Sequence, residues 1–136
     1  MTSRAFHNNL LGPYELFITN YFGYDKVLPM NTGVEAGETS IKLCRKWAYS
    51  KKGIENNKAK VIFAAGNFWG RTITAISTST DPSSYAGFGP YTPGFVVIPY
   101  NDIPALKKAL EDPDVAGFYI EPIQVTNKQL ACYFLV

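Results

Sequence analysis

Three short segments carry side chains and turns that could bind a flat, anionic ligand. In the first, NTGVEAGE, Gly33 stands where an extended run gives way to a helical pattern. The amides in the first turn of a helix attract an anion such as phosphate, and a glycine lets the backbone approach it closely. The segment matches neither of the common glycine-rich phosphate signatures. An ordinary turn between a strand and a helix therefore remains the competing interpretation.

The second segment, AAGNFWGRT, places two rings and an arginine between glycines. A ring such as Phe68 at the end of a strand can stack on a flat heterocycle. Arg71 can hold a carboxylate with two parallel hydrogen bonds. The alternative is a hydrophobic plug formed by Phe68 and Trp69, with Arg71 as an ordinary surface side chain.

The third segment, FYIEPIQ, ends a run typical of a buried strand with the acid Glu121. In a parallel sheet, ligands bind beyond the carboxyl ends of the strands, which is where all three segments are expected to lie. Glu121 alone could assist a reaction or simply cap a turn. Together, an anion-binding turn, a stacking ring and a carboxylate-binding arginine favour a phosphorylated planar cofactor that acts on an amino or carboxylic acid. Pyridoxal phosphate fits that description.

An α/β sheet would bring these segments together. Runs rich in Val, Ile, Phe and Tyr predict four strands, at Lys26–Met30, Lys60–Ala65, Phe95–Tyr100 and Val115–Glu121. Apolar spacing of three and four residues predicts helices up to Phe22, over Glu35–Lys52 and over Asp102–Leu110, with a weaker one over Gly70–Ser79. This alternation favours a mostly parallel sheet with crossover helices. Residues 77–94 form a long irregular loop, which is typical of a functional segment.

The composition excludes several classes of function. The 136 residues suit one domain, and 46% of them are hydrophobic. No window reaches the ~18 consecutive apolar residues of a membrane helix, so no membrane partner is expected. Seven of the thirteen basic residues lie within residues 42–60, beside the single acid Glu55. We interpret this run as the solvated face of a helix rather than a nucleic-acid surface.

No metal site is expected either. His7 is the only histidine. Cys44 and Cys132 are far apart and have no CxxC partner, so they predict neither a zinc site nor a disulfide scaffold.

Long stretches that include NTGVEAGE, NFWGRT and YIEPIQ resemble the ornithine aminotransferase family. These are class III, fold-type I enzymes that use pyridoxal phosphate and work in the mitochondrial matrix. The resemblance runs from about Thr2 to Gln124 and covers an interior part of the family's length. It implies that residues 1–124 form a partial cofactor-binding large domain, and that residues 125–136 are a divergent tail.

The resemblance implies a role for five residues. Gly33 and Val34 match the turn that holds the cofactor phosphate. Phe68 matches the ring that stacks on the pyridine, and Glu121 matches an acid beneath the cofactor. Arg71 matches the arginine that binds the substrate carboxylate.

The resemblance also implies an activity. The family transfers the δ-amino group of ornithine to 2-oxoglutarate, which gives glutamate semialdehyde and glutamate, and its members are built from dimers. No targeting peptide is recognisable in the sequence, so a cytoplasmic location stays open beside the mitochondrial matrix.

The family lysine that forms a Schiff base with the cofactor, and the aspartate that faces the pyridine nitrogen, have no match in the chain. Lys128 is the only lysine after Lys108, and its surroundings do not resemble the family. We therefore expect a truncated chain without a catalytic residue that is inactive alone. The alternatives are a non-catalytic fragment that interacts with or regulates the full-length enzyme, and a small nucleotide-binding α/β module.

Overall fold

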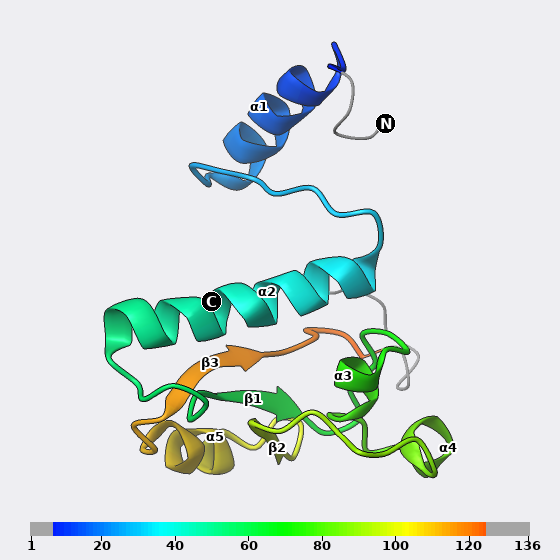
Figure 1. The fold of residues 1–136 in the computed structure, drawn as a ribbon, viewed down its shortest axis with the longest axis vertical. Helices are drawn as coiled ribbons and strands as arrows, with labels where there is room; N and C mark the ends of the chain where they lie inside the picture. Colours follow the sequence, from blue (N-terminus) through cyan, green and yellow to red (C-terminus); the bar gives the residue numbers. More distant parts are fainter. Residues whose placement is uncertain (1–6, 125–136) are drawn as a thin grey trace. The chain divides into compact units, whose positions relative to one another are not determined.

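The structure, a computed structural model, describes residues 7–124. The chain divides into two compact units, Met1–Met30 and Asn31–Val136 (Figure 1). In the first unit, the predicted opening helix is confirmed as α1, Leu11–Phe22. It ends at Gly23, which adopts a φ of +73° and donates its N–H to the Thr19 carbonyl. None of the α1 residues is buried.

The predicted strand at Lys26–Met30 is wrong. These residues form neither a helix nor a strand, although they belong to a β-rich sequence pattern. Pro29 lacks the N–H that a central strand must donate, and a short apolar run becomes a strand only when a neighbouring strand pairs with it. The described part of the chain therefore has three strands where we expected four.

The second unit is built on a three-stranded parallel sheet with the order β2-β1-β3. The central strand β1 spans Lys60–Ala64, and its neighbours are β2, Phe95–Ile98, and β3, Val115–Tyr119. Each strand ends one or two residues earlier than predicted. Because the strands are parallel and joined through helices, the α/β fold with crossover connections is confirmed.

Helix α2, Gly33–Trp47, covers one face of the sheet (Figure 1). It begins two residues before the predicted start and continues into one π-helical turn, Ala48–Lys52. Ile41 and Cys44 of α2 pack against side chains from β1 and β3. Burial raises the pKa of the Cys44 thiol, although the nearby positive charges of Arg45 and Lys52 oppose this effect.

Helix α5, Ile103–Leu110, covers the opposite face. It begins after the predicted capping residue Asp102, whose carboxylate accepts the Ala105 N–H at 2.8 Å. Between the two helices, β1 is buried on both sides, which explains its continuous apolar sequence.

The segment between β1 and β2 holds only two short helices. These are α3, Ile73–Ile76, and α4, Pro82–Tyr85. The predicted helix over Gly70–Ser79 therefore shrinks to about one turn, since its Thr and Ser side chains bond to nearby backbone groups instead. None of the helices within residues 7–124 is long and apolar enough to cross a membrane.

Candidate cofactor and substrate site

The carboxyl ends of β1 and β3 bring two of the predicted segments together. The segment 65–72, which we call the β1 loop, follows β1 and carries Phe68 and Arg71. Glu121 lies two residues after β3, and only 2% of its surface is exposed. Its Oε1 accepts the backbone N–H of Phe68 at 2.7 Å. Glu121, which follows β3, therefore fixes the backbone of Phe68, which follows β1.

The two adjacent rings of the β1 loop have different surroundings. Phe68 is 38% exposed, and the Arg71 guanidinium carbon lies 5.9 Å from the centre of its ring. Trp69 is buried and stacks on Phe63 of β1 at 5.8 Å. Trp69 is thus the hydrophobic plug that the sequence allowed, whereas Phe68 keeps a ring surface open to a ligand.

The start of α2 supplies the third segment. The Thr32 hydroxyl accepts the Glu35 N–H at 3.2 Å and lies 3.1 Å from the Glu35 carboxylate, so Thr32 is the N-cap of α2. Gly33 and Val34 then occupy the first helical turn, where amide groups have no partner within the helix. Nothing lies within 4 Å of the position that a Cβ would take on Gly33, so space is open there.

A close contact joins the start of α2 to the β1 loop. Gly70 adopts a φ of +151°, and a Cβ on it would overlap the Val34 side chain. Glycine is required at this position both by the backbone conformation and by the approach of Val34. A second link is the hydrogen bond from the Thr72 hydroxyl to Glu38 of α2, at 2.6 Å. The structure therefore places the start of α2, through Val34, against the loop that carries Phe68 and Arg71.

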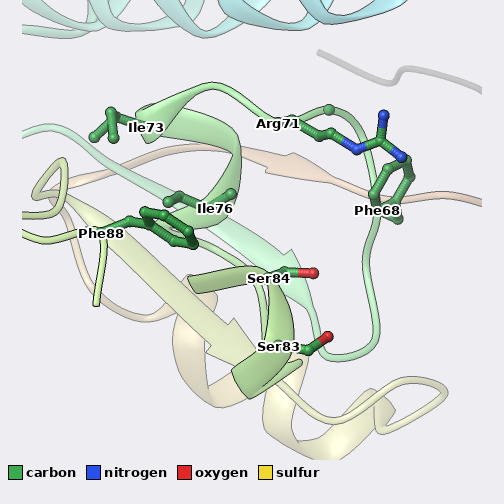
Figure 2. A pocket seen from close by; sticks show the side chains of 8 residues that line it. Phe68, Arg71, Ile73, Ile76, Ser83, Ser84 and Phe88 are labelled. Carbon is green, nitrogen blue, oxygen red and sulfur yellow. The ribbon is translucent and has the colours of Figure 1, made fainter. Parts of the chain in front are cut away.

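Phe68 and Arg71 open onto a cavity of about 340 Å³ (Figure 2). Figure 2 shows the Arg71 guanidinium beside the Phe68 ring at one end, and apolar side chains at the other. The remaining lining comes from Gly70, Ile73, Ile76, Ser83, Ser84 and Phe88. A cavity with one cation, two hydroxyls and an apolar wall suits a small carboxylate with an aliphatic chain.

Several residues that hold the β1 loop were not predicted. Buried or partly buried hydrogen bonds link Thr78 to Asn67 and Trp69 of this loop, and Tyr100 to the Glu121 carbonyl. Thr78 lies in a polar run without periodicity, and Asn67 is a single amide between a glycine and two rings, so no signal in a single sequence distinguishes them from ordinary loop residues. Lys128 and Cys132 lie outside the described residues. Within residues 7–124, no group of three or more His, Cys, Asp or Glu side chains could hold a metal ion.

Comparison with known proteins identifies the class to which this fold and site correspond. Residues 1–127 match the family described as aminotransferase class-III, so the chain belongs to that family. Curated relatives include the mitochondrial ornithine aminotransferase of Rattus norvegicus, 67% identical over 124 residues. A probable mitochondrial ornithine aminotransferase of Caenorhabditis elegans is 60% identical over the same length. Each alignment covers 91% of this chain but only 28% or 29% of the relative.

A solved structure has the same fold over the matched part of its chain. The ornithine aminotransferase of Toxoplasma gondii superposes with a TM-score of 0.87 at 56% identity, covering 91% of this chain and 29% of that protein. That structure has partial occupancy of pyridoxal phosphate (PLP) at its active site. Pyridoxal phosphate is thus the cofactor of the family, and this chain corresponds to less than a third of the length of these relatives.

The described residues fit a phosphorylated planar cofactor. The exposed ring of Phe68 offers a stacking surface, and the buried Glu121 fixes the backbone N–H of Phe68. The first turn of α2 offers amides for an anion beside the open space at Gly33. The Arg71 guanidinium is a cation that can bind a second anionic group, the carboxylate of a substrate.

Proposed function

We propose that the chain forms part of the large domain of an ornithine aminotransferase. The whole enzyme would transfer the δ-amino group of ornithine to 2-oxoglutarate, giving glutamate semialdehyde and glutamate. The observation that carries this proposal is that residues with the chemistry of a cofactor and carboxylate site converge at one sheet edge, in a chain 67% identical to a protein named ornithine aminotransferase.

Each site residue then has a role. Gly33 and Val34 would bind the cofactor phosphate through their backbone amides. Phe68 would stack on the pyridine ring, and Glu121 would support it from beneath through the Phe68 N–H. Arg71 would bind and orient the substrate carboxylate. When bound, pyridoxal phosphate supplies an electron sink for the negative charge that develops beside the reacting nitrogen.

Domain boundaries and location follow from the same proposal. We assign residues 1–124 to the partial large domain and residues 125–136 to a divergent tail. Because the relatives from rat, Drosophila and Caenorhabditis are named mitochondrial, the mitochondrial matrix is the proposed location. The complete enzyme would be dimeric, with ornithine and 2-oxoglutarate as its small-molecule partners.

A binding experiment tests the proposed site. The purified 136-residue chain is melted by circular dichroism with and without pyridoxal phosphate, and retention of the cofactor is measured by equilibrium dialysis. We expect a cooperative transition that the cofactor shifts to higher temperature, because a ligand bound only by the folded state stabilises it. A melting temperature that stays the same at saturating cofactor, with no retention in dialysis, would refute the assignment of Gly33, Val34 and Phe68.

Arg71→Lys distinguishes binding of the substrate carboxylate from binding of the cofactor. Lysine keeps the positive charge but loses the forked pair of hydrogen bonds. We expect pyridoxal phosphate to bind as before, while 2-oxoglutarate binds about tenfold more weakly, corresponding to ~1.4 kcal/mol. Transaminase activity of the 136 residues alone is expected to stay at background. Activity above background that is lost on replacing Lys128 would contradict this.

A second candidate is a non-catalytic chain that associates with a full-length subunit. Exposed apolar side chains in the first unit favour it, since Leu16, Phe17 and Tyr21 are each more than 60% exposed. Mixing the chain with a full-length ornithine aminotransferase tests this alternative. Co-migration in gel filtration and altered activity would support it, and unchanged activity without co-migration would remove it.

A further inference from the structure

Thr78 is a fully buried polar residue that lies outside the proposed binding groups. It follows α3, and none of its surface is exposed. A buried hydroxyl is costly unless it is hydrogen-bonded, so its partners indicate what it does. Those partners flank Phe68 in the sequence, and they are Asn67 and Trp69.

The bonds of Thr78 form a small closed network. Its hydroxyl accepts the indole N–H of Trp69 at 2.8 Å. The hydroxyl proton faces Asn67 Oδ1 and the Ala75 carbonyl, each 2.9 Å away. The Asn67 amide donates in turn to the carbonyls of Thr78, at 2.8 Å, and Ala64, at 2.9 Å. The single hydroxyl proton is shared between its two acceptors, and one orientation of the Asn67 side chain serves both its donor and its acceptor contacts.

This network fixes both neighbours of Phe68 while leaving Phe68 itself exposed. Asn67 and Trp69 are 7% and 9% exposed, whereas Phe68 is 38% exposed. The backbone N–H of Phe68 is held separately by Glu121. A ring whose flanking residues and own backbone are fixed in this way is held ready for stacking without ordering on ligand binding.

We propose that Thr78 is a positioning residue of the site, which sets the Phe68 ring through hydrogen bonds to Asn67 and Trp69. The inference rests on the proposed role of Phe68 in binding pyridoxal phosphate. It assigns to Thr78 no contact with the cofactor or substrate. The hydroxyl is the group that matters, because its methyl group forms none of these bonds.

Two substitutions isolate the hydroxyl. Thr78→Val keeps the shape of the side chain but leaves the Trp69 N–H and Asn67 Oδ1 without their partner. Thr78→Ser keeps the hydroxyl and removes the methyl group. Ile98→Val is the matched control, because Ile98 is a buried side chain at the end of β2 that packs in the cluster on the α5 face.

The first measurement is pyridoxal phosphate affinity, by equilibrium dialysis at a temperature at which every variant is folded by circular dichroism. We expect Thr78→Val to weaken binding roughly tenfold, whereas Thr78→Ser and Ile98→Val stay within about twofold of the parent chain. Equal affinity for Thr78→Val and the parent would overturn the inference. So would an equal loss in the Ile98→Val chain, because the effect would then be one of general stability.

The second measurement needs no cofactor. In a Trp47→Phe background, Trp69 is the only tryptophan, and its emission reports the environment of the indole N–H. We expect Thr78→Val to shift this emission and to speed amide hydrogen exchange in residues 66–71, and Thr78→Ser to restore both. If the parent chain does not bind pyridoxal phosphate, the proposed cofactor role fails, and this measurement still decides the positioning role. Unchanged emission and exchange in Thr78→Val would refute it.

Discussion

Two segments line the same cavity, and they are held in opposite ways. The β1 loop, residues 65–72, is bonded to α2, to the end of α3 and to the segment after β3. The segment 79–94, which we call the outer loop, contains no buried residue. Its hydrogen bonds lie at its ends or within itself, such as that from the Tyr91 hydroxyl to the Tyr85 carbonyl at 2.6 Å.

The difference indicates that the two segments have different roles in the cavity. A group that must stack on a ring or grip a carboxylate gains from a fixed position, since ordering on binding would cost affinity. Phe68 and Arg71 therefore lie on the anchored segment. Ser83, Ser84 and Phe88 of the outer loop complete the cavity wall from a segment with few buried contacts, which is the kind of segment that can adjust to a ligand.

The largest expected effect on stability comes from comparing one glycine in each segment. Gly70 of the β1 loop and Gly87 of the outer loop both have positive φ angles, of +151° and +83°. A Cβ on Gly70 would overlap Val34, whereas nothing lies within 4 Å of the corresponding position on Gly87. We expect Gly70→Ala to destabilise the chain by at least ~3 kcal/mol, from backbone strain and overpacking together.

Gly87→Ala is the control for Gly70→Ala. It carries a backbone penalty without an overlap, so we expect a loss of about 1 kcal/mol. Urea unfolding of both chains, followed by circular dichroism, measures the two values. Similar losses at both positions would show that the close approach of Val34 to Gly70 contributes nothing, and the contrast between the loops would fail.

Glu121 provides the next largest effect. Glu121→Ala removes the acceptor of the Phe68 N–H, and leaving a partly buried donor without its partner costs about 2 kcal/mol. We expect that loss in urea unfolding, together with weaker binding of pyridoxal phosphate. Glu121→Gln keeps an oxygen that can accept the same N–H, so it should lose less in both measurements. Equal effects of the two substitutions would mean that this bond does not support the ring.

The sequence predicted most of this arrangement, because its strongest signals are local. Continuous apolar runs marked β1, β2 and β3, since strands covered on both faces have no polar side. Asp102 marked the start of α5 because its side chain caps the helix. Residue type and position at the strand ends indicated Gly33, Phe68, Arg71 and Glu121, and the resemblance to a known family added Val34 and a role for each residue. The structure brings their segments together.

Other features depend on contacts that a single sequence does not encode. Lys26–Met30 has the composition of a strand, but strand formation needs a partner and Pro29 removes a donor. Thr78 lies in a polar run and Asn67 is a single amide beside two rings, and their burial becomes visible only when the end of α3 packs against the β1 loop. The contrast between Phe68 and Trp69 is also tertiary, because adjacent residues point to different sides of one loop.

Asp81 of the outer loop gives the smallest expected effect, and it depends on pH. Its carboxylate caps α4, and hydrogen bonds from Ser83, first the hydroxyl and then the backbone N–H, hold the pKa of Asp81 below its usual value. A carboxyl with a lowered pKa in the folded state stabilises that state above its usual pKa of about 4 and loses this contribution as the pH falls further.

The melting temperatures of the parent and Asp81→Ala chains, compared from pH 7 to pH 2.5, test this dependence. Because the carboxylate is exposed and solvent screens it, we expect the parent to melt only a few degrees higher at pH 7, with the gap closing below pH 4. Ser83→Ala removes the hydroxyl but keeps the capping carboxylate, so the pKa of Asp81 is lowered less in this chain. The difference in melting temperature between Ser83→Ala and Asp81→Ala should therefore be smaller than that for the parent, and it should disappear at a higher pH. A gap that widens on acidification would reverse the expected sign. If Asp81→Ala lowered the melting temperature at pH 7 as much as Glu121→Ala does in the same melting experiment, the outer loop would be anchored as firmly as the β1 loop.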